Sequence, residues 1–529
     1  MRSVAFAFTL AFAAASSVAL AKEALDAPPI GLTPTSASVT AILHKYHEAS
    51  DFRAPSGRER WTLELGSEKG TRSDVWTADA LRTDETLGPY HNAYGQVNGH
   101  AWHMNENGEV APESGLHQRD DVDSGALARS KTAYFTVLGI SQKPVPSYVL
   151  KLNPPHGRIE YLFFDTTSGD LVRRIAVRDG RRVTTTYQDF RAEGRAVIAH
   201  HLRIEDGKAE NTTDMHLVSA EFNARVAPSE VAEPTPAPPI ATLGTLTHAT
   251  LPGKIIDDRV ILPFSIGKHV VNFQLDSGAD GIVIDHTVVQ ALGYHEYGRI
   301  IGETAGAYVE SDVTIPTMKL GALTIANAHA RSLPFVNFAD ASTPVAGLMG
   351  YDLIANLVIH IDYDHGTVEA FEPSAFTPPA GATRIAIGLD DDVPLVHATI
   401  STATNVPFVL DTGADRSALF SSFIREYPSA ASDRGLGDEM TAAFPFVDDL
   451  SGVGGSVDYR PLQVGPFTFG GSTFDRWLFD VTQNAPTFEI EDYNGLIGQD
   501  VLRYYDLYLD YQHGCIYVSP NARYRERYG

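Results

Sequence analysis

Alternation of apolar and polar residues runs through much of the chain and predicts a mainly β protein. The run RIEYLFFDTTSGDLVRRIAVRDGRRVTTTYQDF, residues 158–190, has the two-residue period of strands and is broken by Ser168-Gly169 and Asp179-Gly180. Such pairs are hairpin turn signals. The same pattern continues in VIAHHLRIEDGKAENTTDMHLVSAEFN. We therefore expect a long antiparallel meander in the front part of the chain.

A single helix is predicted ahead of these strands. In SVTAILHKYHEAS, the apolar residues Val39, Ile42, Leu43 and Tyr46 recur near helical spacing. One helix followed by a long meander resembles the open β-barrel of the periplasmic lipoprotein carriers and their relatives. The resemblance implies a β-rich front domain whose open barrel would hold an apolar ligand.

Two segments of unusual composition set the domain boundaries. Residues 226–240, VAPSEVAEPTPAPPI, contain five prolines and few large apolar side chains, so we expect an extended linker over 227–240. Residues 1–21 combine Arg2, an apolar run and an Ala19-Leu20-Ala21 exit, the pattern of a secretory signal peptide. The front domain then spans 22–226, and the chain is expected in the periplasm or outside the cell.

The back part of the chain, 241–529, contains a tandem repeat. FQLDSGADGIVID, which includes Asp276, is matched by FVLDTGADRSALF, which includes Asp411, 135 positions later. AGLMGYDLI is then matched by NGLIGQDVL, and LVIHIDYDHGTVEAF by YDLYLDYQHGCIYV. Three landmarks in one order predict two related lobes, at 241–375 and 376–529.

The repeated acids have two readings. Asp, Ser and Gly are turn residues, so each triplet could be an exposed turn. However, apolar runs flank Asp276 and Asp411 on both sides, which predicts burial, and burial disfavours a carboxylate charge. Two carboxylates brought together share one proton. One of them can then activate water while the other protonates a substrate carbonyl.

These motifs resemble the aspartic peptidases. Two apolar residues, Asp, Ser or Thr, and Gly, followed later by an apolar pair and Gly, mark that family, and the Gly-Ala-Asp continuation is closer to retropepsins than to pepsins. The resemblance covers about residues 245–520 and implies two β-barrel lobes related by a pseudo-two-fold axis, as in a retropepsin dimer but within one chain. We therefore expect a monomer with an intramolecular pseudo-dimer.

The resemblance also implies roles for individual residues. Asp276 and Asp411 would be catalytic, and their support would come from Ser277, Gly278, Thr412 and Gly413. The substrate backbone would be bound at Ala279, Asp280, Ala414 and Asp415. Glycine-rich stretches would form flaps over the substrate, with Gly302 and Gly306 in the first and Gly452, Gly454 and Gly455 in the second.

Composition narrows the function further. The formal net charge is −25, which argues against nucleic acid and anionic lipid as partners. Outside the signal peptide no apolar stretch is long enough to span a bilayer. The histidines form no closed set of zinc ligands, and the DYDHG and DYQHG runs offer too few ligands for calcium. No metal or cofactor is expected.

Two functions from different classes follow from the sequence. The first is an exported aspartic endopeptidase that hydrolyses polypeptides with water activated by Asp276 and Asp411. The second is a non-catalytic periplasmic protein that binds peptide or lipid through the open barrel and a relic protease cleft. Both triplets are complete in the sequence, and this favours the enzyme.

Overall fold

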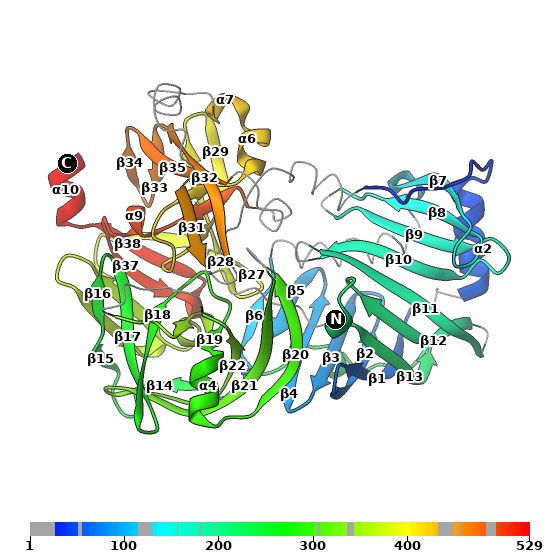
Figure 1. The fold of residues 1–529 in the computed structure, drawn as a ribbon, viewed down its shortest axis with the longest axis horizontal. Coiled ribbons are helices and arrows are strands. Elements are labelled where there is room, and N and C mark those ends of the chain that lie inside the picture. Colours follow the sequence, from blue (N-terminus) through cyan, green and yellow to red (C-terminus); the bar gives the residue numbers. More distant parts are fainter. Residues whose placement is uncertain are drawn as a thin grey trace. The chain divides into compact units, whose positions relative to one another are not determined.

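The computed structural model describes residues 27–50, 55–114, 127, 131–155, 157–178, 181–194, 196–303, 307–335, 343–431, 448–452, 455–482 and 493–529 (Figure 1). The chain divides into two compact units, one formed mainly by residues up to Pro236 and the other mainly by residues from Ala237. The predicted signal peptide lies outside the described residues. No helix in the described ranges combines the length and the hydropathy needed to cross a membrane.

The front unit is built on one antiparallel sheet. Its described strands number 13, in the spatial order β6-β5-β4-β3-β2-β1-β13-β12-β11-β10-β9-β8-β7. They are β1 (Gly57–Leu65), β2 (Glu68–Trp76), β3 (Ala80–Leu87), β4 (Tyr90–Val97), β5 (His100–Met104), β6 (Val110–Pro112), β7 (Phe135–Ser141), β8 (Ser147–Leu152), β9 (Glu160–Asp165), β10 (Leu171–Arg178), β11 (Arg181–Glu193), β12 (Ala196–Glu205) and β13 (Thr213–Phe222).

The predicted front helix is α2 (Val39–Ser50). Its apolar residues Ile42, Leu43 and Tyr46 are buried and pack with a cluster that includes Leu150 and Phe164 of the sheet. Figure 1 shows α2 beside strands β7 to β9. The single-turn helices η1 (Thr132–Tyr134), η2 (Ala209–Asn211) and η3 (Pro228–Glu230) complete the unit. One helix on a long meander confirms the predicted mainly β front domain.

Part of the front sheet buries charged rather than apolar side chains. Asp74, Thr83 and Glu85 on neighbouring strands β2 and β3 are all buried. Arg72 bonds to Asp74 at 2.8 Å and lies 3.9 Å from Glu85, and Thr83 donates to Asp74 at 2.7 Å. These pairs neutralise one another, because an unpaired buried charge is costly. This part of the sheet therefore offers no apolar surface for an apolar ligand.

The proline-rich segment is attached to folded structure at both ends and exposed in the middle. At its start Glu230 accepts a hydrogen bond from Arg58 Nη2 at 2.7 Å, and Val231 is buried. At its end the Ile240 carbonyl accepts from the Ala326 amide at 3.0 Å. Residues 235–239 between these attachments are exposed. The structure thus anchors both ends of the segment that was expected to be extended from 227 to 240.

The first lobe of the back unit is a nine-stranded sheet in its described residues, with the order β14-β22-β19-β23-β18-β17-β21-β20 and β16 paired to β17. The strands are β14 (Ala241–Thr242), β16 (Lys254–Ile256), β17 (Arg259–Ile266), β18 (His269–Leu275), β19 (Ile282–Asp285), β20 (Glu296–Glu303), β21 (Ala307–Leu320), β22 (Leu323–Leu333) and β23 (Gly347–Met349). The helices are α4 (His286–Leu292) and α5 (Tyr351–Ile354).

The second lobe repeats this plan with ten described strands in the order β31-β32-β35-β30-β36-β29-β28-β33-β34 and β27 paired to β28. The strands are β27 (Gly388–Asp390), β28 (Val393–Ile400), β29 (Ala403–Leu410), β30 (Ala418–Leu419), β31 (Asp448–Gly452), β32 (Gly455–Val464), β33 (Phe467–Phe469), β34 (Ser472–Phe474), β35 (Trp477–Thr482) and β36 (Gly495–Ile497). Its helices are α6 (Ser421–Glu426), α7 (Pro428–Ala431), α9 (Gln499–Leu502) and α10 (Ala522–Tyr528).

A third sheet joins the lobes. Its six described strands follow the order β15-β25-β24-β37-β38-β26. The members are β15 (His248–Leu251), β24 (Val358–Asp362), β25 (Thr367–Phe371), β26 (Thr383–Ala386), β37 (Tyr505–Asp510) and β38 (Cys515–Pro520), with η4 (Pro373–Ala375) and η5 (Tyr511–His513) in the connections. Strands β24 and β37, which are the same strand in the two repeats, pair antiparallel at the centre.

Candidate active site

The two repeated triplets occupy equivalent positions at the ends of strands. Asp276 follows β18 and Asp411 follows β29. The amide of Asp276 donates to Met349 and that of Asp411 to Ile497, both at 3.0 Å. Met349 and Ile497 belong to β23 and β36, which run parallel to β18 and β29. Each acid is therefore held at a fixed point where a buried strand ends.

Close packing at these points explains the glycines of the later motif. A Cβ on Gly347 would lie 2.3 Å from the Phe273 ring, and one on Gly495 would lie 2.2 Å from the Ala418 carbonyl oxygen. Both distances are far below van der Waals contact. Only glycine lets β23 and β36 pass this closely beside the strands that carry the acids.

The hydroxyl residues of the triplets lock the two lobes together. The amide of Ser277 donates to Thr412 Oγ1 at 2.9 Å, and the amide of Thr412 donates to Ser277 Oγ at 2.9 Å. In return, Ser277 Oγ donates to the Leu410 carbonyl at 2.7 Å and Thr412 Oγ1 to the Leu275 carbonyl at 3.1 Å. All four bonds are buried and cross from one lobe to the other, so they fix the separation of the two acids.

The structure places the carboxyl groups of Asp276 and Asp411 on either side of Gly413, whose amide bonds to Asp411 and whose Cα faces the carboxyl of Asp276. Both side chains are buried. Oδ1 of Asp276 accepts from the Gly278 amide at 2.9 Å, while Oδ1 of Asp411 accepts from the amides of Gly413 and Ala414 at 2.8 Å. Neither Oδ2 accepts a hydrogen bond from the described residues. Each acid therefore keeps one oxygen that no donor of the described residues occupies.

Gly413 is required by this approach. A Cβ at this position would lie 2.3 Å from Cγ of Asp276 and 2.5 Å from its carboxyl oxygens. The glycine of one triplet therefore packs directly against the acid of the other, and a side chain there would push the carboxyls apart.

Burial and proximity change the protonation of the pair. Burial, and next the charge of Asp411, raise the pKa of Asp276 well above its usual range. Burial also raises the pKa of Asp411 to about 7, although the amides of Ala414 and Gly413 oppose this shift. Two carboxylates this close cannot both ionise easily. The pair therefore keeps at least one proton at mildly acidic and neutral pH.

Two further acids, which the sequence-based analysis did not single out, hold the loops that follow the triplets. Asp352 Oδ2 accepts from the Ile282 amide at 2.6 Å. Asp500 Oδ1 accepts from the amide and the hydroxyl of Ser417 at 2.8 and 2.7 Å. The signal was present, because GLMGYDLI and GLIGQDVL keep an Asp at the same place. Asp352 and Asp500 therefore hold in place the two loops that follow the triplets.

Sequence comparison assigns this part of the chain. A family model described as aspartyl protease matches residues 262–353, which include the first triplet and the GLMG run. Within the back unit, the first lobe thus matches an aspartyl protease domain over residues 262–353. This confirms the resemblance drawn from the triplets. No curated protein sequence matched the chain.

Solved structures similar to the chain fall into two groups. An aspartic proteinase from Irpex lacteus is 11% identical with a TM-score of 0.33 and covers 52% of this chain and 98% of its own. A retropepsin-like aspartic protease from Rickettsia conorii is 14% identical with a TM-score of 0.18 and covers 23% and 89%. A LolA superfamily protein from Nitrosomonas europaea is 15% identical with a TM-score of 0.30 and covers 37% and 97%.

The second acid of each Gly-Ala-Asp motif in the protease domain has an arginine partner. Asp280 is buried and pairs with Arg331, which also lies 3.8 Å from Glu310. Asp415 is half exposed and accepts from Nε of Arg259 at 2.6 Å. Sequence reasoning gave both acids to the substrate backbone and did not identify either arginine. Their contact with substrate stays a prediction, and the greater exposure of Asp415 favours it over Asp280.

The two alanines expected to bind substrate are buried in the protease domain. The Ala279 carbonyl accepts from the Tyr351 amide at 3.0 Å, and the Ala414 carbonyl accepts from the Gln499 amide at 2.8 Å. Both carbonyls thus hold the start of the short helix that follows the GLMG or GLIG run. The structure gives these residues a supporting position, and direct substrate contact stays a prediction.

The expected flap glycines lie on two hairpins of the protease domain. Gly302 is in β20, which pairs with β21, and the Tyr308 ring occupies the space where its Cβ would be, at 2.5 Å. Gly452 and Gly455 face each other where β31 and β32 meet. Gly306 and Gly454 lie outside the described residues. Closure over a substrate stays a prediction for both hairpins.

One further side chain of the second lobe packs against the first lobe and was missed by sequence reasoning. Tyr511, in the DYQHG turn, is buried, and its ring lies 6.1 Å from that of Tyr351. Sequence reasoning considered this turn only as a calcium loop with too few ligands. No pattern in the sequence indicates that it reaches the other lobe.

The described residues contain no group of three or more His, Cys, Asp or Glu side chains arranged to hold a metal ion. Cys515, the chain's single cysteine, is buried in β38.

Proposed function

We propose that the chain is an exported aspartic endopeptidase and that Asp276 and Asp411 are its catalytic pair. The observation that carries this proposal is the burial of the two carboxyls close together, on triplets held by reciprocal bonds between Ser277 and Thr412. Burial of two acids costs free energy, and neutral residues of similar shape would avoid this cost. A purely structural role therefore does not explain why both positions are acids. Export is supported by the signal peptide pattern at the start of the sequence.

The proposed reaction needs one proton on the pair. The ionised acid takes a proton from a water molecule, and the water oxygen attacks the carbonyl carbon of the peptide bond. The protonated acid at the same time donates its proton to the carbonyl oxygen. The tetrahedral intermediate then collapses as the carbon–nitrogen bond breaks: the acid that took the water proton gives it to the leaving nitrogen, and the other acid takes a proton from a hydroxyl group of the intermediate. The pair returns to its singly protonated state without a covalent enzyme intermediate.

A cleavage assay with single-atom changes tests this proposal. Asp276→Asn and Asp411→Asn keep the shape of the side chain but cannot cycle a proton, so we expect each to lower kcat at least about a thousandfold. The substrate would be an unfolded protein, with and without a statine-type inhibitor. Asp475→Asn, at an exposed acid of the same lobe, is the matched control. Normal turnover in either dyad variant would refute the assignment.

The pH profile provides a second check. Because burial raises the pKa of both acids, the singly protonated pair should persist toward neutral pH and disappear at alkaline pH as the second proton is lost. We therefore expect kcat/KM to fall on the alkaline side. A profile that stays flat to about pH 9 would contradict a mechanism that needs the shared proton.

A further inference from the structure

The second repeat ends in a helix that has no counterpart in the first repeat. Strand β38 is followed by α10, whereas the equivalent strand β25 is followed by the single turn η4. Asn521 caps the helix by accepting from the Tyr524 amide at 3.2 Å. The rings of Tyr524 and Tyr528 pack on Phe474 of the second lobe. The helix is therefore a firmly attached part of the second repeat.

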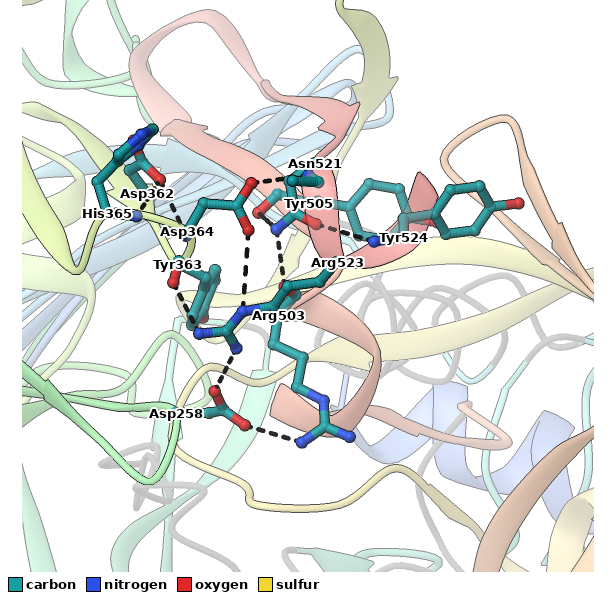
Figure 2. A network of polar contacts seen from close by, with 11 residues as sticks. Asp258, Asp362, Tyr363, Asp364, His365, Arg503, Tyr505, Asn521, Arg523 and Tyr524 are labelled. Atoms are coloured by element: carbon teal, nitrogen blue, oxygen red, sulfur yellow. Dashed lines mark hydrogen bonds and ion pairs between the residues drawn. The ribbon is translucent and has the colours of Figure 1, made fainter. Parts of the chain in front are cut away.

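Figure 2 shows that the start of α10 is bonded to the first repeat. Arg523 Nη1 donates to Asp258 Oδ1 at 2.7 Å, and Arg523 Nη2 donates to the Tyr363 carbonyl at 2.8 Å. The amide of Ala522 donates to Asp364 Oδ2 at 2.7 Å. The three acceptors lie in the β16–β17 and β24–β25 turns. Three bonds thus fasten the C-terminal helix of one repeat to two turns of the other.

Asp258 lies in a tight turn of two residues. Asp257 and Asp258 connect Ile256 of β16 to Arg259 of β17, and both have positive φ angles, of 49° and 66°. This is the geometry of a type I′ hairpin. Asp258 Oδ2 also accepts from Arg503 Nη1 at 2.9 Å, so arginines of the second repeat bind both of its carboxyl oxygens. Such charge-assisted bonds are among the stronger polar contacts in proteins.

The residue after this turn reaches the second triplet. Arg259 Nε donates to Asp415 Oδ1 at 2.6 Å. The Asp415 carbonyl accepts from the Asp500 amide at 3.2 Å, and Asp500 holds the loop after the triplet through Ser417. Because Asp258 and Arg259 are neighbours in a tight turn, the arginines that bind Asp258 also fix Arg259 against the triplet.

The equivalent turn in the second repeat carries a different residue at this position. Asp391 and Asp392 have the same conformation, with φ angles of 51° and 67°. Val393, however, stands where the first repeat has Arg259, and it is buried in an apolar cluster. A valine cannot form an ion pair, so a turn of this kind binds the opposite triplet through an arginine on one side of the site only.

We propose that Arg523 is a positioning residue of the site, which through Asp258 and Arg259 holds Asp415 and the second triplet in place against the first repeat. The inference rests on the proposed peptidase function. Arg523 acts along the bonds that lead from α10 to the turn and from the turn to the triplet. Because a reacting pair loses rate when its geometry loosens, the helix that only the second repeat carries contributes to catalysis.

The kinetic test compares Arg523→Gln with Arg525→Gln, because Arg525 lies on the same helix and bonds to the Pro520 carbonyl of its own segment at 2.6 Å. We expect Arg523→Gln to lower kcat about fivefold with KM nearly unchanged, since Arg523 positions the acids and does not contact substrate. Arg523→Lys should recover part of this loss. Combining Arg523→Gln with Asp258→Asn should be no slower than Asp258→Asn alone, because the two residues act through one contact. Arg525→Gln should match the wild type.

Hydrogen exchange measures the same effect without turnover. The amides of Ser277 and Thr412 bond across the repeats, whereas the amide of Asp411 bonds to Ile497 within its own repeat. We expect exchange at the first two amides to be about tenfold faster in Arg523→Gln, and exchange at Asp411 to be unchanged. If Arg523→Gln does not fold, the same comparison is made with Asp258→Asn.

Two results would overturn the inference. One is an Arg523→Gln enzyme whose kinetics match those of Arg525→Gln. The other is equal acceleration of exchange at all three amides, which would show a general loss of stability and no specific effect on the bonds between the repeats. If the wild type cleaves no peptide, the proposed function fails, and hydrogen exchange still decides whether Arg523 holds the triplets together.

Discussion

At the scale of single residues, the site shows why the second triplet needs glycine at its third position. Gly413 leaves room for the carboxyl of Asp276, and a Cβ would collide with it at 2.3 Å. Ser277 and Thr412 each donate and accept across the lobes. The two hydroxyl residues and Gly413 therefore tie each triplet to the opposite lobe.

Burial of the dyad should reduce stability at neutral pH. The raised pKa of Asp276 means that the folded chain keeps a proton that the unfolded chain loses above about pH 4. Ionisation thus favours the unfolded state increasingly as the pH rises toward the folded pKa. We expect Asp276→Asn, which has no charge to bury, to raise the free energy of unfolding at pH 8 by about 1–3 kcal/mol.

Thermal unfolding at several pH values would measure this effect. The gain in Asp276→Asn should shrink toward pH 4, where the wild-type acid is protonated in both states. Asp475→Asn, at an exposed acid, should show no such trend. A lower melting temperature for Asp276→Asn at pH 8 would mean that the carboxylate stabilises the fold.

At the scale of elements, the six-stranded sheet joins the lobes through a buried histidine. His360 of β24 is 2.9 Å from Glu369 of β25 and hydrogen-bonds Asp506 of β37. Its ring stacks on Tyr508 at 4.0 Å, and His248 of β15 also bonds Glu369, at 3.0 Å. The bond from His360 to Asp506 crosses the central pair of strands, so it links one repeat to the other.

This histidine should make the junction pH-dependent. Burial opposes the charge of His360, but its hydrogen bonds to Asp506 and Glu369 outweigh burial and raise the pKa of His360. Burial also opposes the charge of Glu369, but the bonds to His360 and His248 outweigh it and lower the pKa of Glu369. The histidine's contribution is complete below about pH 6.5 and is lost as the pH rises through its folded pKa. That of Glu369 is lost as the pH falls below about 4.5. The junction is thus strongest between these limits.

Substitution of His360 tests the junction. We expect His360→Gln to lower the free energy of unfolding of the back unit by about 1–2 kcal/mol at pH 5.5, and by less at pH 9. Denaturant unfolding at both pH values measures the difference. His269→Gln changes an exposed histidine on β18 and serves as control. Equal losses at the two pH values would show that His360 contributes only packing.

The limits of sequence reasoning are clearest at these elements. The repeat of DSGAD and DTGAD predicted that two lobes would bring Asp276 and Asp411 together, because the period of the repeat is long and its landmarks keep their order. The partners of the second acids could not be predicted. Arg259 and Arg331 lie far away in sequence and carry no motif. The pairing of β22 with β19 brings Arg331 to Asp280, and the contact between the two lobes brings Arg259 to Asp415. The contact of Tyr511 with the first lobe could not be predicted either, because its turn carries no motif that indicates it.

At the scale of the whole molecule, the chain consists of two units that meet in sequence at Pro236 and Ala237. The connecting residues 235–239 are exposed, whereas Glu230 and Ile240 are bound to their own units by Arg58 and by the amide of Ala326. Because the proposed dyad and both lobes lie after residue 240, peptidase chemistry should need only the back unit.

Cleavage of the connection tests this independence. A specific protease site inserted between Pro236 and Ala237 should allow the chain to be cut into two folded fragments. We expect the back fragment to keep kcat/KM within about twofold of the intact chain, because domains with their own cores fold independently. Separation of the fragments by size exclusion and an assay of each would measure this. Loss of activity after separation would show that the front unit contributes to catalysis.

The pairing of β24 with β37 has a consequence for the history and the engineering of the back unit. Each repeat supplies one of these strands, and they run antiparallel, so a single repeat produced alone would carry an unsatisfied sheet edge that matches its own copy. Such a half-length chain should assemble with a second identical molecule through this edge. Fusion of two such genes would then have freed each half to change independently, as the buried Asp280 and the half-exposed Asp415 illustrate.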